Sequence, residues 1–287
     1  MKIVEKTKRQ TYNEGFNKSL SFLYKTKFGR TCLKFLVKPS VSKISGRFLN
    51  TKISSKMIKG FVKKNNIDLS EYESRRFTSY NDFFTRKIAQ GKRTIAKDKN
   101  AFIAPCDAKL SVYNISDTSV FNIKDSYYTI SDLLDGNELY KEYSNGLCLI
   151  FRLSVDDYHR YCYIDNGTKS TNTFIAGELH TVQPIALENY NIYKRNCREY
   201  TILHTENFND VVQIEVGALI VGKIVNFHEE YAFQKGEEKG MFEFGGSTIV
   251  LLVKENIVDV DEDIIENSKQ GLETIVKYGE RIGTKYE

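Results

Sequence analysis

Histidine is the side chain best suited to proton transfer near neutral pH, and this sequence has four of them. His159 stands apart because it lies in the run VDDYHRYCY, where carboxylates and an arginine surround it just after a predicted strand. Such a setting can tune an imidazole for acid–base catalysis, although charged loops are also common in proteins without a site there. The local pattern leaves both interpretations open. The other three histidines, His180, His204 and His228, are predicted to be structural.

A second pattern with possible chemistry is Gly245-Gly246-Ser247-Thr248, which lies between a glycine-punctuated loop and an apolar run. A serine after glycine at the start of a strand is usually only a turn residue. The same arrangement suits an internal acyl shift, in which the hydroxyl attacks the carbonyl of a small preceding residue that tolerates backbone strain. That reaction needs a base and a carboxylate that orients it, for which His159 and Asp107 (in APCDAKL) are the candidates. The spacing leaves turn and acyl shift as alternatives.

Several common catalytic and metal-binding patterns are missing from the sequence. It has no GxxxxGKS or GxxxxGKT loop, no GxGxxG after a strand and no HExxH, which excludes the usual nucleotide-binding and zinc-protease motifs. The five cysteines are odd in number, widely spaced and without a CxxC pair, so we expect a reducing compartment and neither disulfides nor structural zinc. No apolar run is long enough to span a membrane, and MKIVEKTKRQ lacks the apolar core of a signal peptide. A cytoplasmic protein is expected.

Charge is distributed very unevenly along the chain. Residues 1–64 carry 17 Lys and Arg against Glu5 and Glu14, a net charge of +15, so a whole-chain charge of +5 leaves the remainder at −10. A strongly basic segment on an acidic body indicates a partner of its own, either an anionic membrane or nucleic acid. A third interpretation needs no partner, because basic helices can pack on the body and expose their lysines to water.

Large apolar residues alternate with these cations, most clearly over residues 18–37. On a helix they would form an apolar stripe flanked by lysine and arginine, which is typical of a segment lying in the headgroup layer of a membrane. Pro39 should end that helix or turn the chain, and residues 44–62 repeat the pattern. Membrane contact is therefore favoured over simple packing, and no nucleic acid partner is expected. The stripe consists of Leu20, Phe22, Leu23, Phe28, Leu33, Phe35, Leu36 and Val37.

The remaining sequence predicts an α+β protein. Its composition of 41% hydrophobic and 13% aromatic residues can form a large core. From about residue 100 to 230, short runs rich in Val, Ile, Tyr and Thr alternate with turn signals, as in antiparallel strands. TIVLLVKENI predicts a buried strand, and residues 260–287 predict an acidic loop with a short helix. We therefore expect membrane-associating, mostly helical residues 1–90 on a mostly antiparallel, barrel-like catalytic domain of residues 91–287.

Six segments together resemble the phosphatidylserine decarboxylase family in its prokaryotic, self-processing form. They occur in the family's order and cover roughly residues 75–255. The segments are YNDFFTRKIAQGKR, APCDAKLSVY, DDYHRYCYIDNG, IYKRNCREY, VGALIVGKI and KGEEKGMFEFGGSTIVLL.

The resemblance implies that the chain cuts itself between Gly246 and Ser247. This would give a β chain of residues 1–246 and an α chain of residues 247–287, with Ser247 converted into a pyruvoyl group. That group is the covalent cofactor, so no metal or diffusible cofactor is expected.

The resemblance also implies the reaction. Asp107, His159 and Ser247 match the positions from which the family draws its relay for self-cleavage. A Schiff base between the ketone at position 247 and the serine headgroup would decarboxylate phosphatidylserine to phosphatidylethanolamine, a step of phospholipid biosynthesis. We hypothesise that His159 also returns a proton to the substrate. The expected partners are phosphatidylserine, an anionic membrane at the cytoplasmic face, and the α and β chains of one precursor, with homo-oligomerisation left open.

This chain departs from the family pattern in two places. Many bacterial members have a second histidine three positions after the first, where this chain has Cys162. If the family cleaves with that second histidine, His159 must take over cleavage here or serve both steps. Phe244-Gly245-Gly246-Ser247 replaces the Leu-Gly-Ser of many relatives, and Ala108 replaces a glycine after the aspartate. Neither of these changes removes a group that the chemistry needs.

Three rival functions fit parts of the pattern. The first is a Ser-His-Asp hydrolase that uses the same three residues without cutting itself. The second is a soluble pyruvoyl-dependent amino acid decarboxylase, which would not need the basic N-terminal segment. The third is a non-catalytic, membrane-binding barrel in which Gly-Gly-Ser is only a turn.

Overall fold

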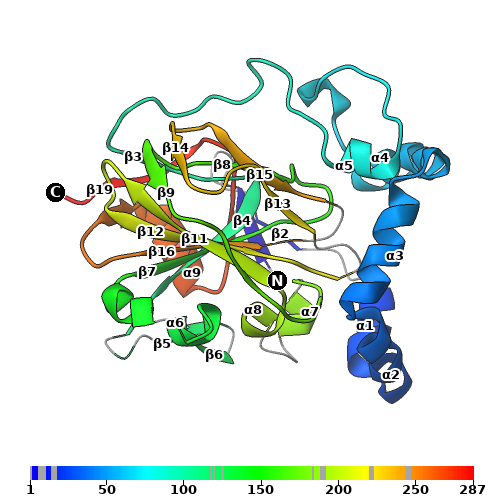
Figure 1. Cartoon of the computed structure of the whole chain (residues 1–287), viewed down its shortest axis with the longest axis horizontal. Helices are drawn as coiled ribbons and strands as arrows, with labels where there is room; N and C mark the ends of the chain where they lie inside the picture. Colours follow the sequence, from blue (N-terminus) through cyan, green and yellow to red (C-terminus); the bar gives the residue numbers. More distant parts are fainter. Residues whose placement is uncertain are drawn as a thin grey trace.

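The computed structural model describes residues 2–5, 11–13, 18–116, 118, 120–123, 126–136, 138–182, 184–187, 192–219, 223–243 and 247–287. Over this part of the chain, a column of helices stands beside a body built on one large sheet (Figure 1). We call residues 18–65 the helical arm. It contains α1 (Lys18–Lys25), α2 (Lys27–Leu36), α3 (Pro39–Leu49), the 3₁₀ turn η1 (Lys52–Met57) and α4 (Ile58–Asn65). The 3₁₀ turn η2 (Leu69–Glu71) and α5 (Tyr80–Phe84) follow the arm.

The breaks between these helices have local causes. The hydroxyl of Thr26 accepts a hydrogen bond from the Gly29 amide at 2.9 Å and so caps the start of α2. Pro39 occupies the first turn of α3, where its missing N–H costs nothing. This confirms the turn predicted at Pro39. α4 ends at Asn66, which adopts the left-handed conformation with φ of 50°.

The main sheet has eleven strands. They are hydrogen-bonded in the order β14-β9-β11-β12-β16-β7-β4-β18-β1-β2, with β10 beside β11. All these pairs are antiparallel except β1 with β18. The strands are β1 (Lys2–Glu5), β2 (Thr11–Asn13), β4 (Ala108–Asn114), β7 (Leu147–Arg152), β9 (Gly167–Lys169), β10 (Thr173–Ile175), β11 (Arg198–Thr205), β12 (Asp210–Val216), β14 (Tyr231–Phe233), β16 (Thr248–Val253) and β18 (Glu273–Val276).

Three smaller sheets and several short helices complete the body. One sheet joins β13 (Ile224–Asn226), β15 (Glu238–Phe242) and β8 (Arg160–Cys162). The others join β17 (Val258–Val260), β19 (Arg281–Lys285) and β3 (Ala101–Ile103), and β5 (Val120–Ile123) with β6 (Ser126–Thr129). The helices are α6 (Ile130–Leu133), η3 (Glu138–Tyr143), α7 (Pro184–Leu187), α8 (Ile192–Arg195) and α9 (Glu262–Lys269). The prediction of an α+β fold with a mostly antiparallel sheet is confirmed. Over the described residues the large sheet is open rather than a closed barrel, with β14 and β2 at its edges.

β16 is the central strand of the body, and all six of its residues are buried. It is paired with β12 on one side and β7 on the other. Because successive side chains of a strand point to opposite faces, Val250 and Leu252 enter one core while Ile249 and Leu251 enter the other. This confirms the predicted buried strand, and it places Ser247 at the start of the most enclosed element of the fold.

The C-terminal tail differs from the sequence prediction. The short helix is present as α9, but the segments predicted as loop form the strands β17, β18 and β19. These strands have only three to five residues each, and they gain their hydrogen bonds from β3, β4 and the N-terminal β1, which are remote in sequence. Local pattern carries no information on such pairings. Residues 247–287 therefore contribute strands to the main sheet and to the β17-β19-β3 sheet.

The helical arm packs on one face of the main sheet. Tyr24, Leu33 and Val37 are buried in the same core as Val250 and Leu252 of β16. The Tyr24 hydroxyl also accepts a hydrogen bond from the Thr181 amide at 3.1 Å. In the part of the chain that the structure describes, no helix is both long enough and apolar enough to cross a membrane.

Candidate active site

His159 lies in the loop between β7 and β8, and its side chain is fully buried. Its Nδ1 is 2.9 Å from the backbone carbonyl oxygen of Asp157. A carbonyl oxygen only accepts hydrogen bonds, so Nδ1 of the neutral ring carries the proton and Nε2 bears the lone pair. Nε2 is buried and has no hydrogen-bond partner among the described residues. The imidazole is therefore oriented as a base with a free lone pair.

Burial keeps this imidazole neutral. It lowers the pKa of His159 to about 4, and the nearby Asp157 only partly opposes the shift. The Asp157 carboxylate is itself fixed by the Lys109 ammonium at 2.6 Å and the Ser154 amide at 2.6 Å. The Asp157 carboxylate thus fixes the loop that holds the imidazole. The low pKa means that the ring is unprotonated at neutral pH.

The segment YNDFFTRKI, which contains α5, positions His159 from the other side. The Phe84 ring lies 4.1 Å from the imidazole, centroid to centroid, and is fully buried. The guanidinium of Arg160 donates from Nε to the Thr85 carbonyl oxygen at 2.8 Å. The segment that contains α5 therefore covers the ring on this side. Sequence analysis did not predict this role, although the aromatic pair in NDFFT is its signal.

Ser247 immediately precedes β16, and its side chain is also fully buried. Its Oγ has no hydrogen-bond partner among the described residues, and neither does Oγ1 of Thr248. A buried hydroxyl without a partner is costly, so two at the same position in the fold require an explanation. Gly246, the other residue of the predicted cleavage site, lies outside the described residues.

Strand pairing brings the His159 loop and Ser247 to the same end of the body. Thr248 is paired with Arg152, where β7 ends and the His159 loop begins. At the other end of that loop, the Phe242 amide donates to the His159 carbonyl oxygen at 2.8 Å. Phe242 thus lies beside His159. Ser247 directly precedes Thr248, which is paired with the residue where the His159 loop begins. The unpartnered atoms of His159 and Ser247 therefore belong to one region, without a direct hydrogen bond between them.

Asp107, the third predicted residue, is buried in a separate group of charges. Its carboxylate accepts hydrogen bonds from Arg93 Nη2 at 2.7 Å and from the Tyr278 amide at 2.8 Å, and Lys277 Nζ lies 3.4 Å away. Burial alone would raise the pKa of Asp107, but Lys277 and Arg93 outweigh it and the net shift is downward. No hydrogen bond in the described residues joins Asp107 to His159. The imidazole is oriented by a backbone carbonyl instead, a contact that side-chain patterns do not reveal.

Comparison with known proteins identifies the family. The sequence profile of phosphatidylserine decarboxylase matches residues 80–284. The chain belongs to this family. Similar proteins include the phosphatidylserine decarboxylase proenzyme 2 of Clostridium acetobutylicum, 54% identical over 93% of this chain and 92% of that protein. The phosphatidylserine decarboxylase proenzymes of Ruminiclostridium cellulolyticum and Clostridium botulinum strain Hall are 43% and 42% identical over 92% and 93% of this chain, covering 90% and 93% of those proteins. The predicted resemblance is confirmed.

Within this decarboxylase family, the departure at Cys162 matters for the choice of base. Cys162 is fully buried. Burial raises the pKa of Cys162 to about 12, so the thiol stays protonated at neutral pH and is no substitute for an imidazole. His159 is therefore the one histidine of the DYHRYC motif.

The other three histidines have partners that account for them. His180 is hydrogen-bonded to the Tyr24 hydroxyl at 3.2 Å and to Glu178. His204 is paired with Asp210 at 2.7 Å on the surface, and His228 is hydrogen-bonded to the Tyr163 hydroxyl at 3.2 Å. These contacts agree with the structural roles predicted for them.

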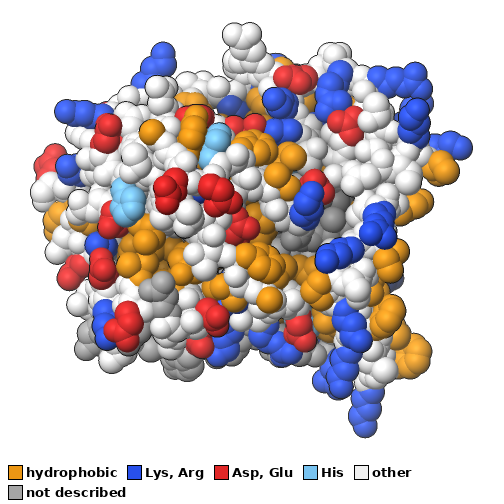
Figure 2. All heavy atoms as spheres, viewed as in Figure 1, with side chains coloured by type: hydrophobic (Ala, Val, Ile, Leu, Met, Phe, Trp, Pro, Cys, Tyr) orange, Lys and Arg blue, Asp and Glu red, His pale blue; other side chains and the backbone are white. Residues whose placement is uncertain are grey.

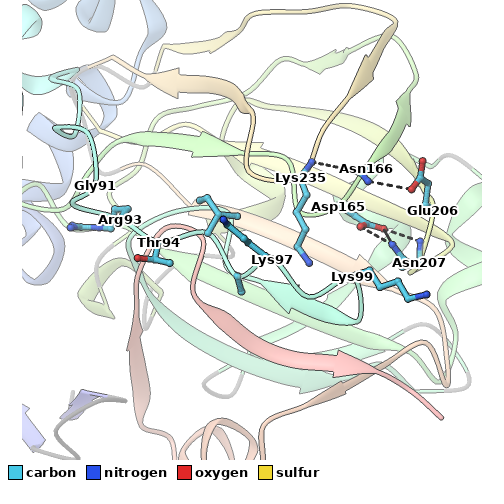
Figure 3. A pocket seen from close by; sticks show the side chains of 12 residues that line it. Gly91, Arg93, Thr94, Lys97, Lys99, Asp165, Asn166, Glu206, Asn207 and Lys235 are labelled. Carbon is cyan, nitrogen blue, oxygen red and sulfur yellow. Dashed lines mark hydrogen bonds between the residues drawn. The ribbon is translucent and has the colours of Figure 1, made fainter.

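A surface pocket of about 730 Å³ lies near the Asp107 group but is separate from the site (Figure 3). Figure 3 shows Lys235 and Asp165 in its wall, with the Asp165 carboxylate directed to Asn207. The backbone amide of Asn207 donates a hydrogen bond to this carboxylate at 2.8 Å. Arg93 borders the pocket, but none of the three predicted site residues is among those that line it. Within the described residues, no group of His, Cys, Asp and Glu could hold a metal ion.

Proposed function

We propose that this chain decarboxylates phosphatidylserine to phosphatidylethanolamine and CO₂, with a pyruvoyl group that it makes from Ser247 by cutting the Gly246–Ser247 bond. Membership of the family supports the reaction. One structural observation supports the residues: His159 Nε2 and Ser247 Oγ are both buried, lie in one region and have no hydrogen-bond partner in the described residues. An unpartnered base and an unpartnered hydroxyl are the two groups that self-cleavage requires.

Self-cleavage begins with an acyl shift. Nε2 of His159 removes the hydroxyl proton of Ser247, and Oγ attacks the carbonyl carbon of Gly246. The carbon–nitrogen bond breaks, the nitrogen takes up the proton, and an ester joins the two residues. Removal of the Ser247 α-proton then expels the Gly246 carboxylate and leaves dehydroalanine, which hydrolyses with loss of ammonia to the ketone. Neutral His159 is suited to both proton removals.

The residues present fit a ketone at position 247. When formed, that group supplies an electron sink for loss of CO₂ from the substrate's amino acid headgroup. The chain itself contributes an environment shielded from water, because His159, Ser247 and Thr248 are fully buried. His159 Nε2 is proposed to hold a proton and return it to the substrate carbon. Asp107, held ionised by Arg93 and Lys277, is proposed to complete the relay by fixing the loops around the base.

The α chain should stay bound after the cut without any covalent link. β16 makes six paired positions with β7 and five with β12, and β18 is paired with β4 and β1. Residues 247–287 therefore remain hydrogen-bonded to the strands of residues 1–246 after the cut.

We further propose that the protein binds peripherally to an anionic membrane at the cytoplasmic face. Large apolar side chains on the helical arm are exposed although its other face packs on the body. The exposed residues are Phe22, Phe28, Phe35, Ile44, Phe48, Ile53 and Met57. Figure 2 shows hydrophobic side chains on the outer side of the column of helices, with lysine and arginine along its length. An apolar surface flanked by cations is suited to the headgroup layer of anionic lipids.

An intact mass spectrum of the purified protein tests the proposed function. We expect two chains, the smaller comprising residues 247–287 with a blocked terminus that borohydride reduces. Turnover is then measured as phosphatidylethanolamine formed from phosphatidylserine vesicles. A single intact chain that a serine-directed phosphonate labels would instead favour a hydrolase.

A further inference from the structure

A cleft of about 480 Å³ lies between the helical arm and the body. One wall is a single face of α3, because its lining residues are spaced three or four apart, as on one side of a helix. These residues are Pro39, Ser42, Lys43, Gly46, Arg47 and Asn50. In Figure 2 the surface is hollowed where the column of helices meets the body. The volume is in the range of small-ligand sites.

The two walls of the cleft differ in character. The α3 wall carries the cations Lys43 and Arg47, whereas the opposite wall includes the apolar side chains of Phe174, Leu179 and Ile224. That wall also carries Glu243, which is paired with Lys223, and Glu199, which accepts a hydrogen bond from Asn226. Phe174 is 62% exposed, which is unusual for a phenylalanine on a strand of the body. The cations of α3, together with the apolar side chains across the cleft, are suited to a ligand that has an anionic group and a hydrocarbon part.

The two cations on α3 have no carboxylate partner among the described residues. Both Lys43 and Arg47 are exposed, and neither forms an ion pair with any residue that the structure describes. By contrast, Lys223 on the body side is paired with Glu243 at 2.9 Å. A lysine and an arginine one helical turn apart can bind the same phosphate group, the arginine through two N–H donors.

One lining residue of the cleft, Glu243, is next in the chain to a residue that contacts the His159 loop. Glu243 lies four positions before Ser247, and its amide donates to the Lys223 carbonyl oxygen at 3.0 Å. The preceding residue, Phe242, is the one whose amide binds the His159 carbonyl. A second face of α3 carries the exposed Ile44 and Phe48, 67% and 50% exposed. The same helix therefore presents one face to the cleft and another to the proposed membrane surface.

We propose that this cleft holds the glycerophosphate part of the substrate phospholipid, with Lys43 and Arg47 binding the phosphate and Phe174 packing against the start of an acyl chain. The inference rests on the proposed function and names where its substrate enters. It makes Lys43 and Arg47 determinants of substrate affinity rather than catalytic residues.

Binding of dihexanoyl phosphatidylserine, kept below its micelle concentration, tests the cleft without a membrane. The Ser247→Ala chain is titrated by calorimetry, alone and with the double change Lys43→Gln and Arg47→Gln. We expect affinity to fall about tenfold or more, as for loss of one or two charge-assisted hydrogen bonds. The matched control changes Lys59 and Lys63 to Gln, which removes the same charge from exposed positions on α4 that do not line the cleft.

Phe174→Ala tests the acyl part. This change should weaken the binding of dihexanoyl phosphatidylserine but leave the binding of glycerophosphoserine, which has no acyl chains, unchanged. Equal affinities in the two double variants, or no saturable binding, would overturn the cleft assignment. Because binding is measured on an uncut chain, these results are independent of whether Ser247 forms a ketone. Failure of the proposed function is seen separately, in the mass spectrum of the unmodified chain.

Discussion

The helical arm exposes apolar side chains, whereas the candidate active site buries polar atoms that have no hydrogen-bond partner among the described residues. On the arm, Phe28 and Phe35 are 70% and 63% exposed, so apolar surface faces water. At the site, Ser247 Oγ and His159 Nε2 are buried without partners. Both arrangements cost free energy in an isolated protein, one through exposed hydrocarbon and the other through unsatisfied polar atoms.

In the proposed function, the two arrangements correspond to membrane binding and to catalysis. Exposed apolar surface is stabilised when a membrane covers it, whereas an unsatisfied hydroxyl and imidazole are used when a backbone carbonyl or a substrate reaches them. Within the arm, α3 lines the cleft with one face and carries exposed apolar residues on another. In the proposed function, substrate passes from the membrane along this helix into the cleft.

The largest expected effect follows from removing the nucleophile. Ser247→Ala should leave one uncut chain with no detectable decarboxylation, because no hydroxyl remains to attack Gly246. Ser247→Cys is the matched control: a thiol can make the same attack, so slow cutting is expected. Both are followed by intact mass. Two chains from the alanine variant would remove Ser247 from the mechanism.

Loss of the base should have the next largest effect. His159→Gln keeps an amide of similar size but no basic nitrogen, and we expect self-cleavage to slow by about 10²- to 10⁴-fold. His204→Gln, at an exposed histidine, is the control and should cut normally. Cleavage by the unmodified chain should be independent of pH between about 5 and 8 and slow near pH 4, where His159 takes up a proton. A normal rate in His159→Gln would show that another base acts.

The same histidine predicts a dependence of stability on pH. Burial lowers its pKa from 6.5 to about 4 in the native state, so the unfolded chain binds a proton more readily between these values. Its contribution is complete above pH 6.5 and is lost as pH falls toward 4, by at most about 3 kcal/mol. Urea denaturation of Ser247→Ala with and without His159→Gln measures this difference, and identical pH profiles would contradict it.

Asp107→Asn should act mainly through stability. It takes the shared carboxylate from Lys277, which is half exposed, and from Arg93, which keeps Glu71. We expect this to cost about 1.5–3 kcal/mol of the free energy of unfolding and to slow cleavage. Asp82→Asn is the control, because its partner Arg75 is exposed and the cost should stay below about 1 kcal/mol. Full stability with lost cleavage would instead make Asp107 a direct member of the relay.

A smaller effect is expected on the arm. Phe28→Ser and Phe35→Ser should each weaken co-sedimentation with anionic liposomes by about tenfold, consistent with one phenylalanine leaving the headgroup layer. Turnover of dihexanoyl phosphatidylserine should not change. Phe227→Ser, at an exposed phenylalanine of the body, is the control. Raised salt should weaken binding by the unmodified protein, and salt-independent binding would argue against the electrostatic part.

The smallest effect is expected at Cys162. Its thiol is protonated, so Cys162→Ala should cut and turn over normally while losing about 1–2 kcal/mol of stability through the small cavity left behind. Cys148→Ala, at another fully buried cysteine, should cost a similar amount. Loss of cleavage in Cys162→Ala alone would show that the thiol has a role in the relay.

The sequence by itself determined the family, the α+β class, the buried strand after Ser247 and the uneven charge of the arm, because each depends on residues close together in the chain. Apolar periodicity and turn residues act locally, so the helices of the arm and β7, β12 and β16 could be predicted.

Only the tertiary structure decided how the site is assembled. His159 is oriented by a carbonyl of Asp157 and covered by Phe84, Asp107 is held by Arg93 and Lys277, and the tail forms strands with β3, β4 and β1. Backbone acceptors have no side-chain signature, and pairings between distant segments depend on the whole core. Burial, which sets the pKa of His159, likewise exists only once the chain has folded.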